Sequence, residues 1–134
     1  MEKKFNASID ELDNVLSFID NEIKDIKDSK LLTKFNLVVE EVFVNIVSYA
    51  YEDTDTNNTV TISINDNDDK TIITFIDSGK HFNPLIKDDP DLSLNVDERP
   101  VGGLGIYLVK KMMDNVEYEY KDNKNILTIE KIHE

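Results

Sequence analysis

The sequence contains no cysteine among its 134 residues. Disulfides and thiolate metal sites are therefore excluded, and a reducing compartment is compatible with the composition without being proved by it. Long apolar runs are missing as well. The N-terminus M-E-K-K-F-N-A-S has no run of signal-peptide length, and no stretch approaches the roughly 20 apolar residues that span a bilayer. Together these absences predict a cytoplasmic protein.

Positive charge is scarce. The chain has 28 acidic residues against 15 basic ones, which gives a formal net charge of −13. A surface of this sign repels phosphate backbones and anionic membranes, so we expect no direct binding to nucleic acid or membrane. A basic protein partner or a metal-neutralised anion stays open, although a high net charge is equally a common means of keeping a protein soluble.

The length and the 40% hydrophobic content allow one domain with a real core and leave too little chain for two. We therefore expect residues 1–134 to form a single domain, without internal repeats.

An edge strand over residues 3–7 and two helices are expected in the first part of the chain. Ser8 and Glu11 match a capping box, which predicts a helix start. The second helix is expected over residues 31–49. Apolar residues at three- and four-residue spacings predict the buried stripe of the first helix: Ile9, Leu12, Val15, Leu16, Ile19, Ile23 and Ile26.

The second helix is apolar on most of its surface from residue 37 to 47, so any polar group there needs a partner. Glu41 and Asn45 are i and i+4 on one face, about 6 Å apart along the axis. They form either a buried hydrogen-bonded pair or a functional pair. In the second case a carboxylate base lies one turn from an amide oxygen that can bind a hard cation such as Mg²⁺.

A hairpin is expected next, with strands at 59–64 and 71–76 around an acidic turn. Its second strand leads into Asp77-Ser78-Gly79. Asp followed two residues later by Gly is often only a turn. Alternatively, the carboxylate accepts a hydrogen bond from an exocyclic amine, and the missing side chain at Gly79 lets a flat ring lie against the backbone.

Residues 84–100 contain three prolines and no periodicity. A connection of this length in a compact domain is usually functional, which predicts a lid at about residues 84–101. Gly102, Gly103 and Gly105 follow and open a helix expected to begin at Leu104. Converging backbone N–H groups and a helix start favour an anion site, although a plain glycine turn before a helix is the simpler interpretation. A closing hairpin is expected at 114–120 and 125–132.

These three stretches, in this order, resemble the ATP-binding domain of the gyrase, heat-shock chaperone, histidine-kinase and mismatch-repair (GHKL) superfamily. E-V-F-V-N at 41–45 is similar to its N box, D-S-G at 77–79 to its first glycine box and G-G-L-G at 102–105 to its second. The longer stretches E-E-V-F-V-N-I-V-S-Y-A-Y and E-R-P-V-G-G-L-G-I-Y-L-V-K-K-M-M-D resemble the small anti-sigma-factor serine/threonine kinases. The resemblance covers essentially the whole chain. It implies the α+β Bergerat fold, a two-layer α/β sandwich whose mixed, mostly antiparallel sheet is covered on one face by helices.

The resemblance also implies roles for the residues of the first two motifs. Asn45 would hold Mg²⁺ against the phosphates, and Glu41 would be the general base. Asp77 would accept a hydrogen bond from the adenine amino group, and Gly79 would form the floor of the adenine pocket.

Further roles are implied near the phosphates. Gly102, Gly103 and Gly105, with the backbone of Leu104, would wrap the phosphates. Arg99, at the end of the lid, matches a family arginine near the phosphates, and Thr128, in the last strand, matches a hydroxyl at the back of the pocket. The sequence departs from the family at His81, beside the adenine region, and His133 is interpreted as a tail residue rather than a ligand.

The implied function is that of an ATP- and Mg²⁺-dependent regulator. It would phosphorylate a Ser or Thr of a small anti-sigma antagonist protein and sequester a sigma factor in its other binding state; a homodimer is expected through the resemblance alone. The alternative is a nucleotide-responsive protein-binding module without catalysis. A histidine-kinase catalytic domain shares the motifs, but the chain has no room for a dimerising phosphoacceptor helix pair, and a motor or chaperone ATPase would need a transducer domain.

Overall fold

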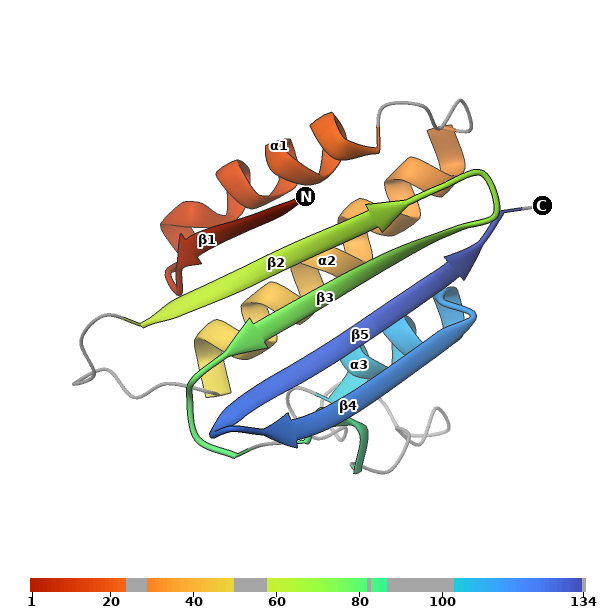
Figure 1. Ribbon diagram of the computed structural model, residues 1–134. Helices are drawn as coiled ribbons and strands as arrows, with labels where there is room; N and C mark the ends of the chain where they lie inside the picture. Colours follow the sequence, from red (N-terminus) through yellow and green to blue (C-terminus); the bar gives the residue numbers. More distant parts are fainter. Residues whose placement is uncertain (24–28, 50–57, 82, 87–102, 134) are drawn as a thin grey trace.

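A computed structural model describes residues 1–23, 29–49, 58–81, 83–86 and 103–133. Within these ranges, five strands form one sheet with the order β1-β2-β3-β5-β4, and every pairing is antiparallel. The three α-helices cover one face of this sheet (Figure 1). The expected α+β fold with a sheet covered on one face is therefore confirmed, and its sheet is antiparallel throughout the described strands rather than mixed.

The elements follow the expected order closely. The strands are β1 (Glu2–Asn6), β2 (Thr59–Asp66), β3 (Lys70–Asp77), β4 (Asn115–Lys121) and β5 (Lys124–Ile132). The helices are α1 (Leu12–Glu22), α2 (Ser29–Tyr49) and α3 (Gly103–Met112), with short 3₁₀ helices at Ile9–Glu11 and Pro84–Ile86. No helix in the described part of the chain combines the length and the apolar character needed to span a bilayer.

Alternation along the strands places the core between the sheet and the helices. In β2, Val60, Ile62 and Ile64 are buried and their neighbours are more exposed, as expected for a strand with one covered face. The long helix α2 contributes the other side of the core with a stripe at three- and four-residue spacings: Phe35, Val38, Val39, Val42, Phe43 and Ile46. The centre of α2 is therefore held tightly against the sheet.

The start of the first helix differs from the expectation. The Ser8 hydroxyl accepts from the Asp10 N–H and caps the 3₁₀ turn, and α1 begins only at Leu12 without a side-chain cap. Ile9 is 52% exposed instead of buried. A 3₁₀ turn has about three residues per turn rather than 3.6, so Ile9 falls out of phase with the buried stripe of α1, to which Val15 belongs. Ile26 lies outside the described residues.

A tight turn between β4 and β5 fixes the register at one end of the sheet. Asp122 and Asn123, between β4 and β5, have φ angles of 55° and 62°, as in a two-residue hairpin turn in which both central residues are left-handed. The resulting register places Asn125 opposite Asp77, at the end of β3. This pairing sets the floor of the site.

Candidate functional site

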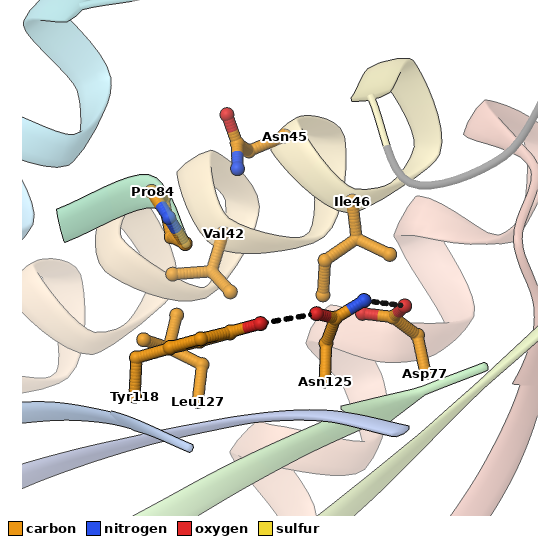
Figure 2. Close-up of a pocket in the computed structure, with 8 residues that line it drawn as sticks. All are labelled: Val42, Asn45, Ile46, Asp77, Pro84, Tyr118, Asn125 and Leu127. Carbon is orange, nitrogen blue, oxygen red and sulfur yellow. Dashed lines mark hydrogen bonds between the residues drawn. The ribbon is translucent and has the colours of Figure 1, made fainter. Parts of the chain in front are cut away.

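A pocket lies between α2 and the sheet, at the end of β3 (Figure 2). The space between its lining side chains is about 340 Å³ when the part open to solvent is counted. Its walls are mainly apolar with a few polar groups: Val42, Asn45, Ile46, Asp77, Pro84, Tyr118, Asn125 and Leu127. The pocket thus brings residues from α2, β3, β4 and β5 together.

Asp77 is the buried acid of this pocket, with 5% of its surface exposed. The Gly79 N–H and the Asn125 Nδ2 group each donate to Asp77 Oδ1, at 2.9 Å. No residue in the described ranges donates to Oδ2. Burial raises the pKa of the Asp77 carboxyl, while the hydrogen bonds from Asn125 and Gly79 act in the opposite direction. A ligand N–H is therefore a suitable partner for the remaining carboxylate oxygen.

Asn125 is a pocket residue that none of the sequence motifs contains. Its Nδ2 group also donates to the Lys80 carbonyl at 2.9 Å, and its Oδ1 accepts from the Tyr118 hydroxyl. Asn125, Leu127 and Ile129 alternate on the buried face of β5. A polar residue on the buried face of a strand needs partners, and this phase was the signal that could have identified Asn125.

Thr128 lies on the other face of β5. It pairs with Thr74 of β3 and Glu117 of β4, and it is out of phase with the two β5 residues that line the pocket. The expected position of Thr128 at the back of the pocket is therefore wrong, because side chains alternate between the faces of a strand. Asn125 is the polar residue of β5 that lines the pocket.

Asn45 and Glu41 point to neighbouring parts of the site. Asn45 lines the pocket from α2. Glu41, one turn earlier, lies against α3: a Cβ added at Gly105 would collide with Glu41 Oε2 and lie 3.2 Å from its Cδ. In the described part of the structure no hydrogen bond joins Glu41 to Asn45. The buried Glu–Asn pair that the sequence left open is therefore not formed.

The first turn of α3 contains the described part of the glycine motif. The helix begins at Gly103, one residue earlier than expected, and continues through Leu104 and Gly105. The N–H groups in the first turn of a helix lack intrahelical acceptors and carry partial positive charge. Arg99 and Gly102 lie outside the described residues, as does the expected lid except for its first turn at Pro84–Ile86.

The two histidines lie at different ends of the sheet. The His81 ring stacks on Tyr120 at 4.2 Å between centroids and lies nearly parallel to Tyr118, at 6.1 Å and 8°. The His133 N–H donates to the Asp69 carbonyl beside the β2–β3 turn, far along β3 from Asp77. His81 is therefore next to a pocket residue, and His133 is at the opposite end of β3.

Comparison with known families assigns the class of the domain. Residues 5–131 match the model of the family described as the histidine kinase-like ATPase domain. The chain therefore belongs to this family and to the GHKL superfamily of ATP-binding domains. A search among curated proteins finds no match.

Solved structures with the same fold include domains of two kinds. The RsbU and RsbW domains of Rv1364c from Mycobacterium tuberculosis superpose with a TM-score of 0.62 at 12% identity. That match covers 98% of this chain and 32% of the other, so this chain spans about a third of its length. The nucleotide-free catalytic domain of histidine kinase ThkA matches with a TM-score of 0.54 at 19% identity, over 98% of this chain and 97% of that one. At these identities the likeness shows the fold alone.

Proposed function

We propose that this chain is an anti-sigma-factor-type regulator that binds ATP with Mg²⁺ and transfers the γ-phosphoryl group to a Ser or Thr of a small antagonist protein. The observation that carries the proposal is Asp77: a buried carboxylate with one oxygen lacking a protein donor in the described ranges, in a mainly apolar pocket of a chain from an ATP-binding family. The proposal treats residues 1–134 as one domain acting in the cytoplasm.

Adenine is proposed to occupy the pocket beside Asp77. The carboxylate would accept from the exocyclic amino group, while Val42, Ile46 and Leu127 supply the apolar surface that a purine ring requires. The Gly79 backbone lies next to the acid because its N–H donates to Asp77. This arrangement supports the proposed role of Gly79 as part of the pocket floor.

The triphosphate is proposed to extend toward Asn45 and the start of α3. The N–H groups of the first turn, at Gly103, Leu104 and Gly105, are suited to phosphate oxygens. Arg99 and Gly102 are also proposed to contact the phosphates, and both lie outside the described residues.

The residues present fit a magnesium ion only when the nucleotide supplies ligands as well. The described ranges contain no group of three His, Cys, Asp or Glu side chains that could hold a metal ion, whereas Asn45 offers an amide oxygen at the pocket wall. Mg²⁺ prefers oxygen ligands and commonly keeps waters and phosphate oxygens in its shell. When bound, the ion would neutralise phosphate charge, and Asn45 is the protein residue proposed to hold it.

Glu41 is proposed as the general base. It precedes Asn45 by one turn on the same helix, beside the first turn of α3 to which the phosphates are assigned. In the transfer, the Glu41 carboxylate would take the proton of the substrate hydroxyl. The hydroxyl oxygen would bond to the γ-phosphorus, and the bond between that phosphorus and ADP would break, so that ADP leaves. Phosphoryl transfer depends mainly on positioning and charge stabilisation, and the carboxylate would contribute to the first by orienting the substrate hydroxyl and accepting its proton.

A second candidate is a nucleotide-responsive module that sequesters its protein partner without transfer. The observation in its favour is that Glu41 packs against Gly105, a structural role that a pure binding protein would also retain. A partner of the sigma-factor or anti-sigma-antagonist class fits both candidates, as does a homodimer.

Substitution of Glu41 by Gln distinguishes the two. Transfer from γ-labelled ATP to a candidate antagonist protein should be lost in Glu41→Gln, while ATP affinity measured by calorimetry should stay within about twofold, because the amide keeps the size of the acid but cannot accept a proton. The matched control is Glu40→Gln, the neighbouring acid on the same helix. Transfer that persists in Glu41→Gln excludes the proposed base, and the absence of ATP binding by the unaltered protein rejects the whole proposal.

A further inference from the structure

Three side chains form a continuous hydrogen-bonded chain across the pocket floor. The Tyr118 hydroxyl donates to Asn125 Oδ1, and Asn125 Nδ2 donates to Asp77 Oδ1 at 2.9 Å (Figure 2). All three residues line the pocket. The chain begins on the edge strand β4, crosses β5 and ends at the terminus of β3, so it lies across the strands rather than along one.

The partners of Asn125 fix which way its amide group points. Its Nδ2 group faces two oxygens, Asp77 Oδ1 and the Lys80 carbonyl, each at 2.9 Å. Rotating the amide by 180° would bring Oδ1 against these two acceptors and would leave the Tyr118 hydroxyl proton facing an NH₂ group. An acceptor facing an acceptor is unfavourable in a buried site. Asn125 is buried, so water does not relieve this conflict.

This fixed orientation determines what Asp77 can offer to a ligand. An N–H that donates to one carboxylate oxygen favours the ionised form of the acid. The ionised carboxylate only accepts hydrogen bonds, so it matches a ligand amino group and repels a carbonyl oxygen. Burial of Asp77 works the other way, since it raises the pKa of the carboxyl. Tyr118 and Asn125 therefore act together against the effect of burial.

We propose that Tyr118 is a specificity-determining positioning residue, which acts through Asn125 to keep Asp77 a hydrogen-bond acceptor and so selects amino-purine over keto-purine nucleotides. The inference rests on the proposed function, because it places the purine beside Asp77.

The test compares ATP with inosine triphosphate, which differ only at C6 and N1 of the purine ring. ATP carries an amino group at purine C6 and inosine triphosphate a carbonyl, so the phosphate contacts cancel in the ratio of their affinities. The unaltered protein should prefer ATP. In Tyr118→Phe the preference should fall roughly three- to tenfold, the effect of one net hydrogen bond. Tyr120→Phe is the matched control on the same strand and should leave the ratio unchanged.

The pH profile separates this role from a merely structural one. The ionisable residues among those that line the pocket are Asp77 and Tyr118, and the variant removes the second. Because Tyr118→Phe weakens the donor that favours ionised Asp77, the pH below which the preference for ATP is lost should move upward. Equal loss of affinity for both nucleotides, with no shift in that pH, would overturn the inference while leaving the proposed function intact. If the unaltered protein binds neither nucleotide, the proposed function fails first.

Discussion

Gly105 shows how a single absent side chain can shape the site. A methyl group there would collide with Glu41 Oε2, the far end of a flexible side chain, so the fold can accommodate it by displacing the carboxylate. Overpacking of this kind costs about 1–3 kcal/mol, whereas replacing Gly by Ala within a helix gains up to about 1 kcal/mol. The two effects therefore oppose one another, and Glu41 decides the sign.

We predict that Gly105→Ala is neutral or destabilising in the unaltered protein and stabilising by up to about 1 kcal/mol when Glu41 is also replaced by Ala. Urea unfolding of the four variants in a double-mutant cycle measures this difference. An identical effect of Gly105→Ala in both backgrounds would show that Glu41 does not occupy the space beside Gly105. If Glu41 is the general base as proposed, phosphoryl transfer should also fall in Gly105→Ala, because the carboxylate is displaced.

Asp77 illustrates a conflict between stability and function at one residue. Its pKa is raised in the folded protein, mainly by burial. The folded state therefore binds the proton more tightly than the unfolded state, and stability falls as pH rises from the ordinary Asp pKa to above the raised value. We predict that Asp77→Asn removes this fall and raises the melting temperature at neutral pH, while ATP affinity drops roughly 10- to 100-fold.

Thermal unfolding of Asp77→Asn between pH 4 and 8, alongside ATP titration, measures these opposed changes. Asp68→Asn, in the exposed β2–β3 turn, is the control and should alter neither property. A variant that is less stable at neutral pH would mean that the carboxylate charge stabilises the empty pocket, contrary to the effect assigned to burial.

At the scale of elements, Asp114 links the end of α3 to the last strand, β5, through a hydrogen bond and an ion pair. Its Oδ2 accepts from the Ile132 N–H at 2.6 Å and lies 3.5 Å from the Lys131 ammonium. The Ile132 hydrogen bond is the main cause of the lowered pKa of Asp114. The pKa of Asp114 is lower in the folded protein than in the unfolded chain. Its contribution to folding stability is therefore present above the ordinary Asp pKa and is lost as pH falls through the folded value.

We predict that Asp114→Ala increases hydrogen exchange at the Ile132 amide at neutral pH and leaves the centre of β5, such as Leu127, protected. Exchange followed by NMR measures both positions in one experiment. Unchanged protection at Ile132 would show that the strand pairing alone holds this end of β5.

The elements were largely predictable from sequence, but the contents of the pocket were less so. The i, i+4 spacing of Glu41 and Asn45 and the strand end at Asp77 are local patterns, and they fixed where these residues lie along their elements. The choice between Asn125 and Thr128 was not local. It depended on the phase of β5 and on its pairing with β3, which are set by contacts between segments almost 50 positions apart. The role of Tyr118 was not predictable for the same reason, since its hydrogen-bond partner Asn125 belongs to the neighbouring strand β5.

At the scale of the whole molecule, the net charge of −13 opposes the binding of an anionic nucleotide. The repulsion acts over a Debye length of about 30 Å at 0.01 M salt and only about 8 Å at 0.15 M. In the proposed site, the N–H groups at the start of α3 and the magnesium ion would act at much shorter range and would be screened less. The long-range repulsion therefore weakens first when salt is added.

We predict that ATP affinity at constant Mg²⁺ rises by a few-fold as potassium chloride increases from about 0.01 to 0.15 M, the reverse of a site dominated by basic side chains. Chelation of Mg²⁺ should weaken binding severely at every salt concentration, because the uncompensated triphosphate then meets an acidic protein. Calorimetric titration over this range measures both effects. ATP affinity that falls with salt would indicate that a local cation, with Arg99 the first candidate, outweighs the charge of the whole chain. ATP affinity that is unchanged by chelation would exclude Asn45 as a magnesium ligand.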